Sequence, residues 1–288
     1  TGPVRLKDVA GFSGRTNDVV YCPPLSPTFQ PSTSQSVVVY FGGDVQDFPE
    51  NMNVQRDNAH YIKWNLEAMA TILGENFTHE HIVIIRPSRM EFRMFSCFDN
   101  FVPSDNMGSP EHTPNHNALN HLQSLLCTIS NVLSDNVCKR ELLRLDRARI
   151  MVVGFSKGCV VLNQLVYEFH YLSTLMPDDS TLMHFVRRIS DMFWLDGGHA
   201  GGKNTWITSR SLLETLTRLC ISIHVHVTPY QVGDEKRPWI RREEKAFSDM
   251  LQKLGAPINR TLHFEGQASL LSHFQLLSEF IKSPSPNK

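Results

Sequence analysis

One short segment, Gly154-Phe155-Ser156-Lys157-Gly158, combines residue types that could carry out nucleophilic chemistry. The apolar, β-branched run before it predicts a buried strand over residues 150–154, and apolar residues at helical spacing after it predict a helix. A serine between two glycines on such a turn is typical of a nucleophile elbow, where the serine backbone is strained and side chains two positions away would collide with the neighbouring strand and helix. The alternative is an ordinary strand-to-helix turn whose serine only caps the helix.

A serine at this position needs partners, because it is a poor nucleophile until an imidazole takes its proton and a carboxylate orients that imidazole. His273 follows the last predicted strand and is the candidate base, although it could instead only cap or pack against its helix. Asp234 follows the penultimate strand and is the favoured carboxylate. Asp196, one strand earlier, is the alternative, and Glu235 is the third choice. The chain order serine, aspartate, histidine is the order expected for this chemistry on such a sheet.

Negative charge that develops on a carbonyl oxygen requires two amide donors, an oxyanion hole. The amide of Lys157, directly after the serine, is one candidate, and the second is Gly43 or Asp44 in the turn that follows a predicted strand. The glycine pair Gly42-Gly43 could also be no more than a strand-ending turn. The side chain of Lys157 could favour an anionic substrate, but a solvated lysine is the default expectation.

These residues must be positioned by an α/β fold, because short buried strands alternate with longer amphipathic helices along the chain. Such alternation predicts a mostly parallel sheet with helices on both faces, and functional sites beyond the carboxyl ends of its strands. Strands are predicted over residues 37–41, 81–86, 150–154, 189–195, 221–227 and 259–264, and helices over about 58–73, 117–133, 157–172, 209–219, 239–254 and 274–281.

The predicted α/β domain spans residues 37–282, after an N-terminal extension, 1–36, with an edge hairpin built from 4–6 and 18–22. Residues 283–288 form a polar tail that we expect to be disordered. Residues 87–116, after the second main strand, lack any period and interleave aromatic residues with Pro, Ser, Asn and Asp, which indicates a long lid-like loop. Its aromatic residues could line an acyl pocket or could pin the loop to the body of the protein.

Composition excludes several classes of function. The chain has 288 residues, is 41% hydrophobic and 20% charged, and carries a formal net charge of -1, which is typical of a soluble globular protein and gives no reason to expect nucleic acid as a partner. No uncharged apolar run is long enough to span a bilayer, so no transmembrane segment is expected. The six cysteines are scattered without a C-x-x-C pair, which favours a reducing compartment, and no targeting segment is expected within this chain.

Metal and cofactor chemistry is not expected. His224 and His226 would share one face of a strand, as two metal ligands might, but no third ligand lies nearby in the sequence. We therefore predict no metal site and no cofactor.

Taken together, the elbow, the Gly42-Gly43 turn, the Asp234 loop and His273 resemble the α/β-hydrolase superfamily over residues 37–282. The segments 40–47, 154–158 and 194–199 also resemble a family of vertebrate mitochondrial hydrolase-like proteins named for an open reading frame on human chromosome 2. The resemblance implies a mitochondrial location, in the matrix, and a cleaved leader. Many esterases carry histidine where this chain has Phe41, and two glycines where it has the single Gly158, so the substrate class stays open.

Two functions are compatible with these observations. The leading hypothesis is a serine hydrolase that cleaves a small-molecule ester or thioester, with an acyl-lipid as one possible substrate, through an acyl-serine intermediate. The alternative is a catalytically silent protein of the same fold that acts as a protein-binding platform in mitochondria, with its triad vestigial or covered by residues 87–116.

Overall fold

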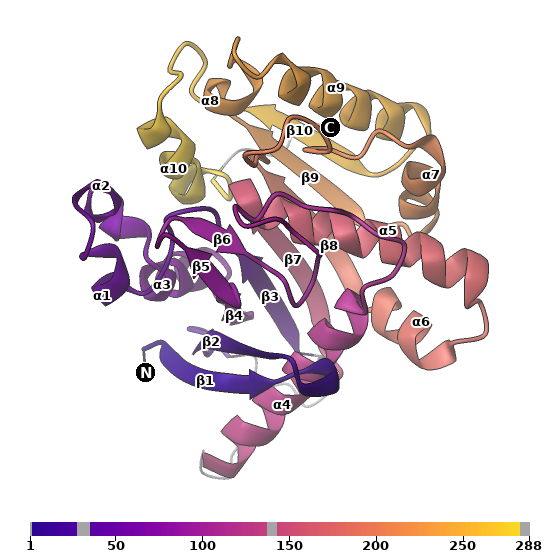
Figure 1. Ribbon diagram of the computed structural model, residues 1–288. Coiled ribbons are helices and arrows are strands. Elements are labelled where there is room, and N and C mark those ends of the chain that lie inside the picture. The colour runs from indigo at the N-terminus through magenta and orange to yellow at the C-terminus, as the bar shows by residue number, and fades with distance from the viewer. Residues whose placement is uncertain (1, 28–34, 137–142, 283–288) are drawn as a thin grey trace.

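The structure, a computed structural model, describes residues 2–27, 35–136 and 143–282. Within these ranges the central feature is an eight-stranded sheet in the order β1-β2-β4-β3-β7-β8-β9-β10 (Figure 1). The strands from β4 to β10 along this order run parallel, whereas β2 is antiparallel to both of its neighbours. The predicted mostly parallel sheet is therefore confirmed. Its strands are β1 (Val4–Ala10), β2 (Thr16–Cys22), β3 (Ser36–Phe41), β4 (His81–Ile85), β7 (Arg149–Phe155), β8 (Ile189–Leu195), β9 (Ser222–Val227) and β10 (Ile258–Leu262).

Helices cover both faces of this sheet, as the sequence predicted (Figure 1). Alternate residues of β3 belong to two different hydrophobic clusters, with Val37, Val39 and Phe41 in one and Val38 and Tyr40 in the other, because successive strand side chains point to opposite faces. This is why β3 reads as a continuous apolar run. The helices are α1 (Pro49–Met52), α2 (Arg56–Ala59), α3 (Leu66–Asn76), α4 (Ala118–Asn136), α5 (Cys159–Leu175), α6 (Ser180–Arg187), α7 (Arg210–Arg218), α8 (Pro229–Val232), α9 (Pro238–Lys253) and α10 (Leu270–Glu279), with single 3₁₀ turns at Phe12–Gly14, Ile62–Trp64 and Ser156–Gly158.

One predicted helix is broken. The sequence predicted a single helix over residues 58–73, whereas the structure has α2, a 3₁₀ turn and then α3. Asn65 sets the break, because its side chain accepts hydrogen bonds from the amides of Glu67 and Ala68, each at 3.0 Å, and so begins a new helix. Apolar residues on either side of Asn65 keep helical spacing, which conceals the break in the sequence.

The N-terminal residues form part of the main sheet. β1 and β2 make an antiparallel hairpin at its edge, and β2 continues into the sheet by pairing with β4 (Figure 1). Both strands of this hairpin are longer than the segments 4–6 and 18–22 that the sequence predicted. No helix among the described residues is long and apolar enough to cross a membrane. The predicted tail, 283–288, lies outside the described residues.

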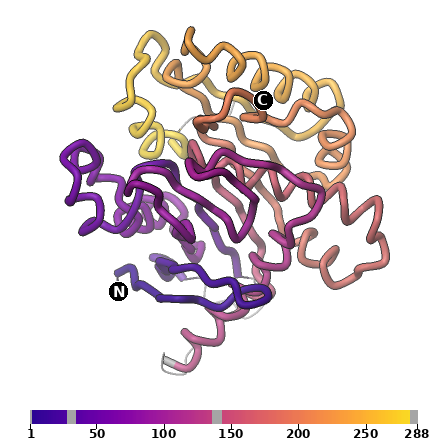
Figure 2. The backbone as a smooth tube through the Cα atoms, viewed as in Figure 1, coloured from indigo at the N-terminus to yellow at the C-terminus, as the bar shows by residue number. Residues whose placement is uncertain are grey.

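The long segment between β4 and α4 crosses in front of the central strands (Figure 2). It contains a small hairpin of β5 (Arg89–Glu91) and β6 (Phe95–Cys97), which the sequence did not predict. Two of its aromatic residues are buried against Phe41, with ring centroids of Phe98 at 5.7 Å and Phe101 at 5.0 Å, whereas Phe92 at the hairpin turn is 72% exposed. Phe98 and Phe101 thus pin the segment to the core rather than line a pocket.

Candidate active site

Ser156 lies on a sharp turn between β7 and α5. Its φ of 54° is in the left-handed region, which a side-chain-bearing residue adopts only at a cost in conformational energy. A Cβ atom at Gly154 would lie 2.7 Å from Leu162 Cδ1, and one at Gly158 would lie 2.0 Å from the carbonyl oxygen of Phe41. The collisions that the sequence predicted on either side of the serine, with the helix and with the neighbouring strand, are therefore present.

His273 lies in the first turn of α10, where the side chain of Ser269 caps the helix by accepting from the amide of Ser272. The imidazole is buried, and its Nδ1 lies 2.6 Å from Oδ2 of Asp196. The centroid of its ring also lies 4.5 Å from the ring centroid of Phe155, the residue before the serine. Nδ1 faces the carboxylate, so the other ring nitrogen, Nε2, is left to exchange a proton with a reacting group.

Asp196 follows β8 directly and is fully buried. Its amide donates to the carbonyl of His226 at 2.7 Å, which ties this turn to the adjacent strand β9. Thr228, the residue after β9, donates from its amide to Asp196 Oδ1 at 2.8 Å and from its hydroxyl to Oδ2 at 2.5 Å. A buried carboxylate needs such donors, and they fix its orientation toward the imidazole.

Asp234, the favoured carboxylate in the sequence, is not the partner of His273. Its Oδ2 accepts from Arg237 Nε at 2.7 Å, and this contact holds the pKa of the Asp234 carboxyl below its ordinary value. The sequence predicted a loop here, but the short helix α8 begins directly after Thr228 and precedes Asp234. Glu235, the third choice, is exposed. The alternative, Asp196, occupies the place beside the imidazole.

The turn after β3 lies against the serine, since a Cβ atom at Gly43 would lie 2.9 Å from Ser156 Cβ. The amide of Gly43 donates to Gln46 Oε1 at 2.9 Å, and the same oxygen accepts from the hydroxyl of Tyr40 at 2.8 Å. Because this amide already has a buried partner, Gly43 is a poor choice for the second oxyanion donor. Asp44 is then the remaining candidate in this turn.

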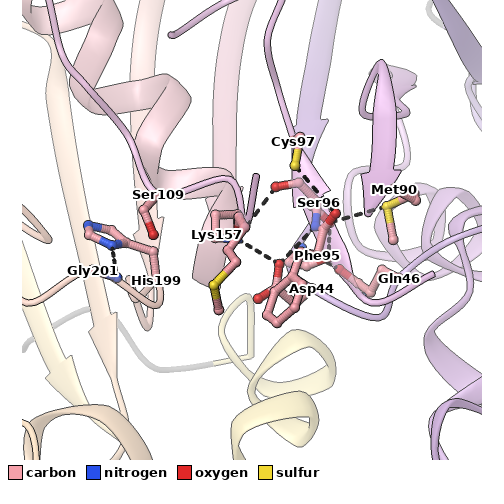
Figure 3. A network of polar contacts seen from close by, with 12 residues as sticks. Asp44, Gln46, Met90, Phe95, Ser96, Cys97, Ser109, Lys157, His199 and Gly201 are labelled. Atoms are coloured by element: carbon pink, nitrogen blue, oxygen red, sulfur yellow. Dashed lines mark hydrogen bonds and ion pairs between the residues drawn. The ribbon is translucent and has the colours of Figure 1, made fainter. Parts of the chain in front are cut away.

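The side chain of Lys157 has neither of the roles that the sequence suggested. It is fully buried, and its Nζ lies 2.9 Å from Asp44 Oδ1 (Figure 3). The same Nζ lies 2.6 Å from the carbonyl oxygen of Met107. It is therefore neither solvated nor free to attract an anionic substrate. Burial raises the pKa of the Asp44 carboxyl, and the charge of Lys157 opposes that shift.

The two histidines of β9 have other partners. His224 Nε2 lies 2.8 Å from Asp191 Oδ2, and His226 Nδ1 lies 2.8 Å from His263 Nε2. Burial lowers the pKa of His226 to about 3. Across residues 2–27, 35–136 and 143–282, no group of three or more His, Cys, Asp or Glu side chains is arranged to hold a metal ion.

Sequence reasoning missed three residues that complete the site: Thr228, Gln46 and Tyr230, whose ring lies 4.7 Å from that of His273. Thr228 did carry a usable signal, because it comes directly after a predicted strand. Tyr230 carried none, since its contact with His273 joins distant segments. Gln46 carried none, since a polar residue three positions after Gly43 in a turn is not by itself a signal.

Comparison with known proteins gives close relatives in sequence. The model of a family described as C2orf69 matches residues 5–144 and 134–257. The mitochondrial protein C2orf69 homolog of Danio rerio is 37% identical, over 97% of this chain and 86% of its own length. The Mus musculus homolog is 37% identical over 84% of this chain and 77% of its own length. The Homo sapiens protein, named mitochondrial protein C2orf69, is 36% identical over 85% and 74%, respectively.

Solved structures are similar only at low identity. A thermostable esterase matches 96% of this chain with a TM-score of 0.49 and 13% identity, and the enterobactin esterase FES from Shigella flexneri matches 98% with a TM-score of 0.49 and 14% identity. The chain spans 60% and 59% of the lengths of these two proteins. Nothing about activity or substrate follows from these two similarities.

Proposed function

We propose that this chain, which belongs to the C2orf69 family of mitochondrial proteins, is a serine hydrolase that cleaves a small-molecule ester or thioester. The support is chemical: a strained serine lies on a turn from strand to helix, and an imidazole with a buried carboxylate at its Nδ1 packs against the ring of Phe155, the residue before that serine.

In the proposed reaction, Ser156 Oγ attacks the carbonyl carbon of the substrate while His273 Nε2 takes the hydroxyl proton. Asp196 holds the imidazole in one tautomer and stabilises the cation that forms. The amides of Lys157 and Asp44 donate to the oxyanion of the tetrahedral intermediate. His273 then gives its proton to the leaving alcohol or thiol, and an acyl-serine remains. His273 then takes a proton from water, whose oxygen attacks the acyl carbon. The bond between that carbon and Ser156 Oγ breaks, Oγ receives the proton from His273, and the carboxylic acid leaves.

The observation that carries the proposal is the hydrogen bond of 2.6 Å between His273 Nδ1 and Asp196 Oδ2, with the imidazole 4.5 Å from the ring that precedes Ser156. Residues 196 and 273 are far apart in sequence, and both are buried. A histidine that only capped its helix would not need a buried carboxylate with two further donors. An acyl-lipid is one substrate to test, although the buried aromatic residues of segment 87–116 do not argue for it.

The test is covalent labelling of the purified protein with a fluorophosphonate, which reacts with activated serines. We expect wild type and Ser173→Ala, a control at an exposed serine, to be labelled equally, and Ser156→Ala not to be labelled. Hydrolysis of p-nitrophenyl esters should fall by about 10⁴-fold or more in Ser156→Ala. An unlabelled wild type, or equal labelling of Ser156→Ala, would refute the proposal.

A second candidate function, a silent binding platform, is favoured by one observation. Lys157, next to the serine, holds the carbonyl of Met107 and so ties segment 87–116 over the turn. If the protein is a platform, then Ser156→Ala and His273→Ala should restore function in cells that lack the protein as well as wild type does. If it is an enzyme, neither variant should restore it.

A further inference from the structure

Resting on the proposed hydrolase function, we propose that the side chains of Asp44, Lys157 and Ser96 are positioning residues for the oxyanion hole. Asp44 and Lys157 are the two residues whose amides we assign as oxyanion donors. Their side chains form an ion pair with each other, Oδ1 to Nζ at 2.9 Å (Figure 3). The two donor amides belong to residues far apart in sequence, and this pair joins those residues directly.

Ser96, from β6, fixes the direction of one donor. Its hydroxyl donates to the carbonyl oxygen of Gly43 at 2.7 Å, and its amide donates to Asp44 Oδ1 at 2.9 Å. The carbonyl of Gly43 and the amide of Asp44 belong to the same peptide unit, which is planar and trans, so the C=O and N–H bonds point in opposite directions. A hydrogen bond that anchors the carbonyl therefore also sets where the Asp44 N–H points.

Gln46 restrains the same turn from the other side. It accepts from the amide of Gly43 at 2.9 Å, and its Nε2 donates to the carbonyl of Trp64 at 2.8 Å. The peptide units before and after Gly43 thus each have a side-chain partner, one from Gln46 and one from Ser96. Donors that are already oriented stabilise a transition state without reorganisation when charge develops.

The cation of Lys157 is held by fixed acceptors away from solvent. In addition to Asp44 it reaches the carbonyls of Met107, at 2.6 Å, and Ser96, at 3.5 Å. Gly108 makes this possible, since it has a φ of +74° and a Cβ atom there would lie 2.9 Å from Lys157 Nζ and 2.3 Å from the Ser96 carbonyl oxygen. Segment 87–116 therefore holds in place both the turn after β3, at Gly43 and Asp44, and the elbow at Ser156.

The inference predicts a specific kinetic effect. Two variants test this effect: Ser96→Ala removes one oxygen, and Lys157→Met removes the buried cation. Each should lower kcat for p-nitrophenyl acetate by about 10-fold to 100-fold and change KM by less than about 2-fold. The effect falls on kcat because the oxyanion donors bind the transition state and not the ground-state substrate. Both variants should also weaken inhibition by a trifluoromethyl ketone, whose adduct carries an oxyanion, by a similar factor.

The matched control is Arg89→Gln. Arg89 braces the same segment through Asp99, at 3.1 Å, and through Glu91, but it contacts neither the turn nor the elbow. We expect this variant to keep kcat within about 2-fold of wild type, even if its thermal unfolding midpoint falls as far as that of Ser96→Ala.

The outcomes separate this inference from the proposed function. If wild type is not labelled by the fluorophosphonate, the hydrolase proposal fails and this inference fails with it. If wild type is labelled and hydrolyses the ester, but Ser96→Ala keeps wild-type kcat, the inference alone is overturned. An equal fall in kcat for Arg89→Gln also overturns it, because the effect would then come from a loosened segment rather than from the donor amides.

Discussion

Thr228 donates two hydrogen bonds to Asp196, from its amide at 2.8 Å and from its hydroxyl at 2.5 Å. The hydroxyl shares its acceptor, Oδ2, with Nδ1 of His273. The carboxylate is fully buried, so its charge is compensated only by donors of the protein itself. Thr228 should therefore be needed to keep the imidazole in its orientation.

Replacing Thr228 by valine, which has the same shape without the hydroxyl, should lower kcat for a p-nitrophenyl ester by about tenfold or more, since a hydrogen bond to a charged group contributes about 1.5–3 kcal/mol. Thr228→Ser keeps the donor and should stay within a few-fold of wild type. Steady-state kinetics on the three proteins check this, and equal activity of Thr228→Val and wild type would contradict it.

The two candidate carboxylates can be compared by the same substitution. Asp196→Asn should reduce kcat by about 10³–10⁴-fold, because a neutral amide cannot stabilise the imidazolium, and its NH2 group, if turned toward Nδ1, would hold the ring in the wrong tautomer. Asp234→Asn only weakens an ion pair with Arg237 at the edge of a loop and should change kcat less than about 2-fold. The rate of fluorophosphonate labelling gives the same comparison without a chosen substrate. The reverse order of effects would restore Asp234 as the orienting carboxylate.

The glycine after the serine should be essential for stability. In Gly158→Ala the new Cβ would lie 2.0 Å from the carbonyl oxygen of Phe41, a backbone atom that cannot move without shifting β3. We expect the free energy of unfolding to fall by about 3 kcal/mol or more. Gly202→Ala is the control, because no atom lies within 4 Å of a Cβ there, and urea unfolding of both variants measures the difference.

His121 gives a prediction for the dependence of stability on pH. It is fully buried, with Nδ1 accepting from the amide of Phe12 at 3.1 Å and Nε2 lying 2.7 Å from Asn17 Oδ1. A backbone amide can only donate, so Nδ1 must be unprotonated and the ring neutral. Burial lowers the pKa of His121 to about 4.

Below pH 6.5 the unfolded chain therefore takes up a proton at His121 that the folded protein takes up only near pH 4. The free energy of unfolding should fall as the pH drops through this window, by up to about 1.4 kcal/mol per pH unit from this residue. His121→Gln should flatten the slope measured by urea unfolding between pH 7 and pH 5. The same change at His184, which is exposed, controls for the loss of one histidine. An unchanged slope in His121→Gln would refute the assignment.

Much of the fold could be predicted because its signals are local. The strand over 189–195 was predicted with its observed bounds, and the elbow could be recognised from three residues and the pattern around them. The fold that the resemblance to the α/β-hydrolase superfamily implies, a mostly parallel sheet with helices on both faces, is the fold observed. The resemblance to the mitochondrial family is confirmed by the relatives, whose names also agree with the expected mitochondrial location.

What could not be predicted depends on packing between distant segments. The position of Asp234 after the penultimate strand was a sound reason to choose it, yet the imidazole binds Asp196. Only the packing of α10 against the end of β8 decides between them. Similarly, nothing local marks Lys157 as buried, because its partners come from residues 44 and 107. Long polar side chains are expected in solvent until a specific acceptor is known.

The pairing of β2 with β4 has a practical consequence for shortened versions of this chain. A protein that begins at residue 37, where the sequence predicts the domain boundary, would lack the hairpin and leave one side of β4 without hydrogen-bonding partners. An unpaired apolar edge of this kind recruits strands from other molecules and leads to aggregation. With the hairpin present, the strand at this edge of the described sheet is β1 instead, whose register shifts between Leu6 and Val9 and so offers a poor template for further strands.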